Sequence, residues 1–380
     1  MWPTLLIQIV QRLHMKTAHR ITALKALLDE AGIDILIVTN LLNIRYLTGF
    51  TGSAGTLLIP SSSRSADDFG LLFTDGRYRE QAALQIDESD AQVAIQIGSA
   101  RKQFEQSVLF ARGSSIIAIE ADSTSLALFN QWSEAMEQTI VPSTVKIEVL
   151  RRFKDETEVS QLRTACQIAD TALSRVLPKL SDEPTENEFA TELDYQMRML
   201  GAEGPSFETI VASGANSSMP HARPTDKKIV EGDAVVIDFG ATWNGYHSDC
   251  TRTYFLGSTP SDKFERIYSA VEQSQIAGVS KTLLEMEISS IDKACRDSLA
   301  GHQLAEFFTH STGHGVGLEV HELPWVHSES NSSLALGDVV TVEPGVYLPG
   351  ELGVRIEDTI AITQAGSECL TIISKSPLIS

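Results

Sequence analysis

The sequence predicts an α/β domain followed by an α+β domain. In the 380-residue chain, short apolar runs alternate with amphipathic helical stretches up to residue 150, as in a sheet covered by helices. Charged residues interrupt this pattern around 146–154. Beyond them, long amphipathic helices are followed by strand patterns and tight turns, which indicate a mostly antiparallel sheet. We therefore expect one domain at residues 15–150 and a second at residues 151–380.

The elements of the first domain follow from apolar spacing. A helix is expected from His19, because Ile21, Leu24 and Leu28 share one helical face and Gly32 is placed to end it. The Ser- and Asp-rich segment 61–69 is expected to be a surface loop. Short apolar runs predict buried strands at Ile35–Thr39, Thr56–Ile59, Leu71–Thr74, Gln92–Ile97 and Ser115–Ile119. Helices are expected to begin near Arg77, Arg101 and Ser123.

Capping signals locate the helices of the second domain. Asp155 with Glu158, and Thr185 with Glu188, have the spacing of capping boxes. Ser261 is placed to cap a third helix. Apolar residues recur at helical spacing after each cap. Strands are expected between and after these helices, at Ala234–Phe239, Thr251–Phe255, Val339–Glu343 and Val354–Ile362.

Charge and cysteine content limit the setting and the partners. Fifty acidic and thirty basic residues give a formal net charge of -20. Such a surface repels phosphate backbones and anionic membranes, so neither nucleic acid nor a membrane is expected as a partner. Four cysteines without a CxxC pair indicate a reducing compartment, the cytoplasm. The apolar run Thr4–Val10 lacks signal-peptide features, and Met15 is expected to be an alternative start that makes residues 1–14 a dispensable tail.

A predicted hairpin brings two aspartates onto one face. Asn244-Gly245 between alternating apolar residues is a strong turn signal. With that turn, Asp238 pairs with Thr251, and Asp238 and Asp249 become diagonal neighbours on the same face. Two carboxylates on one face repel each other unless a cation lies between them. The hairpin alone leaves two alternatives open, a cation site and a pair of solvated aspartates.

Three of the nine histidines fall within twelve residues. His310, His314 and His321 stand among glycines, which let the backbone approach a ligand closely. Neutral imidazole binds first-row transition metals, and a second histidine can donate a hydrogen bond to a developing oxyanion. A lone histidine is more often structural, but this density indicates a functional site.

Two glutamates interrupt apolar, strand-like runs. Glu343 and Glu357 would be costly to bury without partners, and metal ions would supply them. Arg355 precedes Glu357 by two residues, so on a strand both side chains face the same way. The alternative is a plain ion pair between Arg355 and Glu357.

Taken together, these motifs resemble the metallopeptidase family of aminopeptidase P, prolidase and methionine aminopeptidase. The matching features are Asp238, Asp249, Gly313–Gly317, His321–Pro324, Glu343–Gly345 and Arg355–Thr359. In the first domain, Asn43–Phe50 and Thr74–Tyr78 are similar to the amino-terminal domain of bacterial Xaa-Pro peptidases. The resemblance implies a creatinase/prolidase-like α/β domain followed by an α+β domain with the pita-bread fold.

The resemblance also implies two divalent metal ions, with Mn²⁺ expected and Co²⁺ or Zn²⁺ as alternatives. The implied ligands are Asp238, Asp249, His314, Glu343 and Glu357. Their four carboxylates balance the charge of two divalent ions. In the family mechanism, a hydroxide bridging the ions attacks the scissile carbonyl, and Glu343 would also shuttle the proton.

Further roles are implied for four residues around the metals. His221 matches a histidine that contacts substrate near the leaving group, and His321 one that stabilises the tetrahedral intermediate. Arg355 matches an arginine that orients the substrate or supports a ligand. His310 matches a family position that is less consistently occupied.

The implied reaction is hydrolysis of the bond between an N-terminal residue and a penultimate proline. The extra domain and Arg355 favour this over a methionine aminopeptidase, and the intact ligand set disfavours creatinase-type relatives and a catalytically silent scaffold. Some dipeptide-restricted members carry a basic group near His-Glu-x-Pro, where this sequence has Trp325 and Val326. We therefore favour an aminopeptidase over a dipeptidase. The expected partner is a peptide with proline in second position, and the expected assembly is a homodimer.

Overall fold

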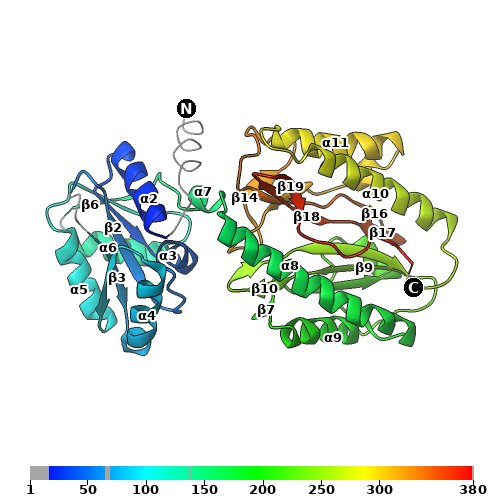
Figure 1. The fold of residues 1–380 in the computed structure, drawn as a ribbon, viewed down its shortest axis with the longest axis horizontal. Helices are drawn as coiled ribbons and strands as arrows, with labels where there is room; N and C mark the ends of the chain where they lie inside the picture. Colours follow the sequence, from blue (N-terminus) through cyan, green and yellow to red (C-terminus); the bar gives the residue numbers. More distant parts are fainter. Residues whose placement is uncertain (1–16, 65–68, 137, 379–380) are drawn as a thin grey trace. The chain divides into compact units, whose positions relative to one another are not determined.

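The computed structural model describes residues 17–64, 69–136 and 138–378. The chain divides into two units, residues 1–151 and residues 152–380 (Figure 1). The expected start at Met15 and the segment 1–14 lie outside the described residues. A helix with the length and hydrophobicity needed to span a bilayer is absent from the described part of the chain.

The first unit is built on a six-stranded mixed sheet in the order β4-β3-β2-β1-β5-β6. β2 pairs antiparallel with β1 and β3, and the other neighbours are parallel. The strands are β1 (Ile35–Val38), β2 (Thr56–Pro60), β3 (Gly70–Thr74), β4 (Val93–Ile97), β5 (Ile116–Ile119) and β6 (Thr139–Pro142). The helices are α2 (Thr17–Ala31), α3 (Leu41–Thr48), η1 (Gly76–Tyr78), α4 (Arg79–Ser89), α5 (Ala100–Ala111), α6 (Leu126–Ala135) and α7 (Glu148–Arg151).

All five strands expected in this unit are present, because the apolar runs that predicted them form its core. Ile35, Ile37 and Ile117 are fully buried and pack with Trp132 of α6. The apolar pattern did not predict α3 or β6. Both are short, and β6 lies at the sheet edge with part of its length exposed, so neither carries a clear apolar period.

The predicted caps begin the helices of the second unit. Asp155 and Thr185 both form complete capping boxes, and the Ser261 side chain accepts a hydrogen bond from the Phe264 amide. The corresponding helices are α8 (Glu156–Val176), α9 (Glu186–Met199) and α10 (Asp262–Lys281). The helix α11 (Ile288–Gly301) was not predicted, and its first residue follows Glu287, which makes no side-chain cap. Short 3-10 helices are present at η2 (Leu177–Asp182), η3 (Gly214–Ser218) and η4 (Ala305–Phe307).

The named strands of the second unit pair only in antiparallel fashion within the described residues. The sheets have the orders β12-β9-β8, β11-β10-β7, β14-β13-β15-β18-β19 and β16-β17. Their first strands along the chain are β7 (Gly204–Pro205), β8 (Ile210–Ser213), β9 (Ala234–Phe239), β10 (Ala241–Trp243), β11 (Tyr246–His247) and β12 (Cys250–Phe255). The later strands are β13 (Gly313–Gly315), β14 (Glu322–Val326), β15 (Val339–Val342), β16 (Gly345–Leu348), β17 (Leu352–Arg355), β18 (Asp358–Thr363) and β19 (Gly366–Cys369). Together with the helices, they form the predicted α+β domain.

The hairpin that carries the two aspartates has the predicted register. Trp243 pairs with Tyr246 across Asn244-Gly245, and Asp238 pairs with Thr251. Both turn residues have positive φ, which an Asn-Gly pair adopts readily. Between the two paired stretches the backbones approach closely at Gly240, where a Cβ atom would lie 1.9 Å from the Ser248 carbonyl oxygen. Position 240 therefore requires a residue without a side chain, because the returning backbone at Ser248, next to Asp249, lies against it.

One predicted strand is divided in two. The apolar run predicts a continuous strand over Val354–Ile362, but the structure has β17 and β18, with Ile356 and Glu357 between them. β17 pairs with β16, whereas β18 pairs with β15 and β19. The apolar pattern continues because both segments are buried, so it carries no signal that the chain moves from one sheet to another. The break leaves Glu357 outside both ladders.

Candidate active site

The side chains nominated from the sequence meet at one cavity of about 430 Å³ within the second unit. Its wall includes Asp238, Asp249, His314, Glu343, Glu357, His221, His310, His321 and Arg355. They come from several segments between residues 221 and 357 of the chain. Other lining residues were not nominated, among them Phe207, Glu208, Arg223 and Ser311.

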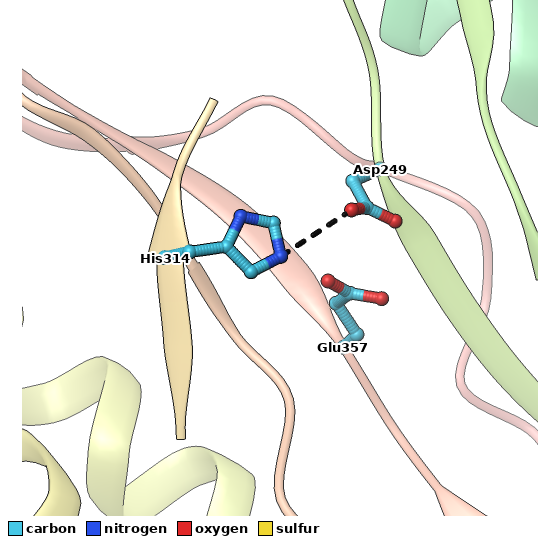
Figure 2. A group of neighbouring side chains, drawn as sticks. All are labelled: Asp249, His314 and Glu357. Atoms are coloured by element: carbon cyan, nitrogen blue, oxygen red, sulfur yellow. Dashed lines mark ion pairs between the residues drawn. The ribbon is translucent and has the colours of Figure 1, made fainter. Parts of the chain in front are cut away.

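Three buried ligand-type side chains form the centre of the site. Ligand atoms of Asp249, His314 and Glu357 all lie within 4.8 Å of one another. Figure 2 shows them pointing toward a common point from three separate segments. His314 Nε2 lies 3.6 Å from Asp249 Oδ2 and 3.6 Å from Glu343 Oε1. These separations exceed hydrogen-bond distance. The side chains therefore surround a shared space and do not bond to one another across it.

The carboxylates at this centre repel one another. Burial, followed by the charge of Glu357, raises the pKa of Asp249 well above its ordinary value. The pKa of Glu343 is raised well above its ordinary value for the same two reasons, in the same order. Burial and the charge of Asp238 raise the pKa of Glu357 to about 8. Without a compensating cation, such a cluster holds protons near neutral pH.

Two unpartnered oxygen atoms show that the cluster fits a divalent cation. Asp238 Oδ1 and Glu357 Oε1 are buried and have no hydrogen-bond partner among the described residues. Their other oxygens are fixed, since Asp238 Oδ2 accepts a hydrogen bond from Arg355 at 2.6 Å and Glu357 Oε2 one from Thr251 at 2.8 Å. Each carboxylate is thus oriented through one oxygen and offers the other, as expected for ligands of a hard cation.

His314 is held in the form that a metal ligand requires. Its Nδ1 lies 3.0 Å from the carbonyl oxygen of Gly315, which assigns the proton to Nδ1 and leaves Nε2 with its lone pair toward the cluster. Burial and the neighbouring His321 lower the pKa of His314 to about 4. The imidazole is therefore neutral near pH 7.

Arg355 is locked into the wall by four hydrogen bonds. It donates to Asp238 Oδ2 at 2.6 Å, Thr251 Oγ1 at 2.9 Å, the Pro220 carbonyl at 3.1 Å and the Tyr347 hydroxyl at 2.8 Å. Its ion pair in the structure is with Asp238, so the plain Arg355–Glu357 pair considered above is wrong. Arg355 orients a nominated ligand and also fixes the segment that leads into His221.

Two further predicted histidines, His321 and His310, line the cavity around the cluster. His321 stacks edge-on against His314, with 4.3 Å between ring centroids. His310 Nε2 lies 3.0 Å from the Tyr347 hydroxyl, which links it to Arg355. Burial and the Arg355 charge lower the pKa of His310 to about 4. Tyr347 was not among the predicted site residues, although its place four residues after Glu343 in the same motif was a usable signal.

A buried ion pair supports the segment that carries His314 and His321. Lys154 Nζ lies 2.6 Å from Glu322 Oε1, and their side chains are only 1% and 3% exposed. Glu322 directly follows His321, and its carboxylate also accepts a hydrogen bond from the Glu319 amide. A Cβ on Gly317 would lie 2.2 Å from Glu322 Oε1, so the loop is packed tightly around this carboxylate.

Replacing Lys154 by methionine is expected to lower the free energy of unfolding by about 3–5 kcal/mol, because it leaves Glu322 buried without its cation. Lys179→Met is the matched control. Lys179 pairs with Glu192 at 2.8 Å, but the side chains are 52% and 31% exposed, so a loss of no more than about 1 kcal/mol is expected. Urea unfolding followed by tryptophan fluorescence measures both. Equal midpoints for the two variants would contradict a structural role for Lys154.

Comparison with known proteins places both units in known families. Residues 160–364 match the model of metallopeptidase family M24, and residues 20–153 match the creatinase/prolidase N-terminal domain. The chain is 38% identical over 353 residues to an uncharacterized peptidase, YqhT, of Bacillus subtilis, covering 93% of this chain and 97% of the relative.

Solved structures agree over nearly the whole chain. An Xaa-Pro dipeptidase from Bacillus anthracis superposes with a TM-score of 0.88 at 36% identity, covering 96% of this chain and 100% of the other. An X-Pro aminopeptidase from Thermotoga maritima gives 0.82 at 34% identity, covering 92% and 98%. The predicted resemblance and fold are confirmed, and this chain belongs to metallopeptidase family M24, with a creatinase/prolidase N-terminal domain.

Proposed function

We propose that this enzyme is an Xaa-Pro aminopeptidase, which removes the N-terminal residue from peptides with proline in second position. The observation that carries the proposal is the single cavity in which four carboxylates and His314 face His221, His321 and Arg355. Similarity to both an Xaa-Pro dipeptidase and an X-Pro aminopeptidase supports the reaction class. Because these two relatives differ in the length of substrate that their names state, the proposed preference for longer peptides is based on the residues of the site.

The proposed metal ligands are those named from the sequence. Asp238, Asp249, His314, Glu343 and Glu357 would hold two divalent ions, proposed to be Mn²⁺. The oxygen-rich donor set with one imidazole suits Mn²⁺. When bound, the ions supply Lewis-acid activation of water and of the scissile carbonyl. The four carboxylates neutralise two such ions, which explains why this chain gathers groups that otherwise repel one another.

The protein's own groups would move protons and orient the peptide. Glu343 reaches the edge of the cluster and is the proposed carrier of a proton from the attacking water to the leaving nitrogen. His321 would donate a hydrogen bond to the developing oxyanion, and burial, which lowers its pKa, keeps this imidazole neutral. His221 would contact the substrate near the leaving proline. Arg355 keeps Asp238 in position.

The preference for an aminopeptidase comes from the charges on the cavity wall. A dipeptide Xaa-Pro presents a carboxylate directly after its proline. Trp325, and not a basic residue, lines the cavity at the position noted in the sequence. Arg355 is committed to four partners, and Arg223 pairs with Glu208. A neutral peptide bond after proline fits this wall better than a free carboxylate.

Steady-state kinetics on Ala-Pro and Ala-Pro-Ala with added Mn²⁺ test the proposal. We expect a higher kcat/KM for the tripeptide. A higher value for the dipeptide would replace the aminopeptidase assignment by the dipeptidase alternative, which the names of several relatives favour. Cleavage of an N-terminal Met-Ala peptide with neither proline substrate cleaved would overturn the proline assignment itself.

A further inference from the structure

An exposed ion pair stands on the wall of the active-site cavity. Arg223 Nε lies 3.2 Å from Glu208 Oε2, and both residues line the cavity. Their side chains are 81% and 63% exposed, respectively. Solvent screens the attraction between two exposed charges, so this ion pair is weak. A charged substrate group that reaches this part of the wall can therefore exchange with either partner.

Of the two arginines on this wall, Arg223 is the one that can exchange its present partner for a substrate group. The described lining residues include two arginines, and Arg355 is buried and fixed by four hydrogen bonds. Arg223 has Glu208 as its ion-pair partner. An arginine fork binds a carboxylate through two parallel hydrogen bonds, so Arg223 is suited to receive one.

Arg223 lies near the part of the cavity that we propose receives the leaving proline of the substrate. It lies two residues after His221, which we place near the leaving proline. The same segment is anchored to the metal cluster, because the Pro220 carbonyl accepts a hydrogen bond from Arg355. With His221 at the leaving proline, a group attached to that proline would lie on the side of the cavity lined by Glu208 and Arg223.

We propose that the Glu208–Arg223 pair determines how this enzyme discriminates between a free carboxylate and a peptide bond after the substrate's proline. Glu208 neutralises Arg223 and repels an incoming carboxylate, which disfavours dipeptides. A neutral peptide bond leaves the pair intact, so longer substrates avoid this penalty. The inference rests on the proposed Xaa-Pro peptidase function and assigns its choice of substrate length to two named side chains.

Ala-Pro and Ala-Pro-NH₂ test this inference, because they have nearly the same size and differ in charge. The measured quantity is the ratio of kcat/KM for the acid to kcat/KM for the amide, in the full-length Mn²⁺-loaded enzyme. Glu208→Gln is expected to raise the ratio about two- to fivefold, since it removes the repulsion and releases Arg223. Arg223→Gln is expected to lower it by a similar factor. Both effects should shrink at high ionic strength.

Matched controls come from a second partly exposed pair outside the cavity. Arg163 Nε lies 2.8 Å from Glu368 Oε1, with side chains 36% and 39% exposed. Arg163→Gln and Glu368→Gln should leave the ratio unchanged. An unchanged ratio in both cavity variants, or an equal loss for acid and amide in Arg223→Gln, overturns the inference while the parent enzyme remains active. A parent enzyme that cleaves neither compound overturns the proposed function and this inference with it.

Discussion

Glu343→Ala is expected to abolish turnover of proline peptides. The substitution removes a proposed ligand and the proposed proton carrier together, and positioned proton transfer alone contributes about 10²–10⁴-fold to a rate. Glu343 lies at the edge of the cluster, 3.6 Å from His314 Nε2, with a side chain 17% exposed. Its removal relieves repulsion among the carboxylates, so the metal-free variant should fold at least as well as the parent. The measurements are kcat on Ala-Pro-Ala and bound metal per chain.

Two further variants separate these roles from a general effect of lost acidity. Glu343→Gln keeps the size of the side chain but holds no exchangeable carboxyl proton, so we expect turnover to fall as severely as in Glu343→Ala. Glu351→Ala removes an exposed acidic residue that pairs with Lys263 in the same unit, and it should leave kcat unchanged. Near-normal activity and metal content in Glu343→Ala would show that the site is misplaced.

Local signals predicted the parts of the fold that depend on local chemistry. The capping boxes at Asp155 and Thr185 predicted two helix starts, because cap and partner stand three residues apart. The Asn244-Gly245 turn predicted a register that holds as far as Asp238 and Thr251, since each paired residue fixes the next. The hairpin, the histidine density and the interrupted apolar runs pointed to most of the site residues, the family resemblance implied their roles, and the fold brings them to one cavity.

The features that were missed depend on contacts between distant segments. Lys154 and Glu322 form a buried pair across 168 positions, and neither residue is unusual in its local sequence. The break between β17 and β18 arises because Arg355 and Asp358 join different sheets, while the apolar period runs on unchanged. α11 begins without a side-chain cap, so its start had no signal in the sequence. Tertiary packing decides these features, and a single sequence does not display it.

Removing the metal ions with a chelator is expected to abolish activity while the chain stays folded. The second unit has two extensive apolar cores, one that includes Phe264 and Ile291 and one that includes Leu173 and Phe189, and none of these four residues lines the active-site cavity. A core of this size should fold without metal, unlike a small zinc domain. Circular dichroism before and after chelation, with activity restored by Mn²⁺, provides the measurement. Loss of secondary structure on chelation would contradict the expectation.

The metal-free protein should also lose stability as the pH rises, whereas the loaded protein should not. Burial and Asp238 raise the pKa of Glu357 to about 8 from an ordinary value of 4.5. The folded metal-free protein therefore binds this proton more tightly than the unfolded chain does. The resulting stabilisation is complete below pH 4.5 and is lost as the pH rises through about 8. Metal ions bind the deprotonated carboxylates, so their affinity increases over the same range. We expect the difference in Tm between loaded and metal-free protein to widen from about pH 6 to about pH 8, and a constant or narrowing difference would show that these carboxylates do not hold the metal.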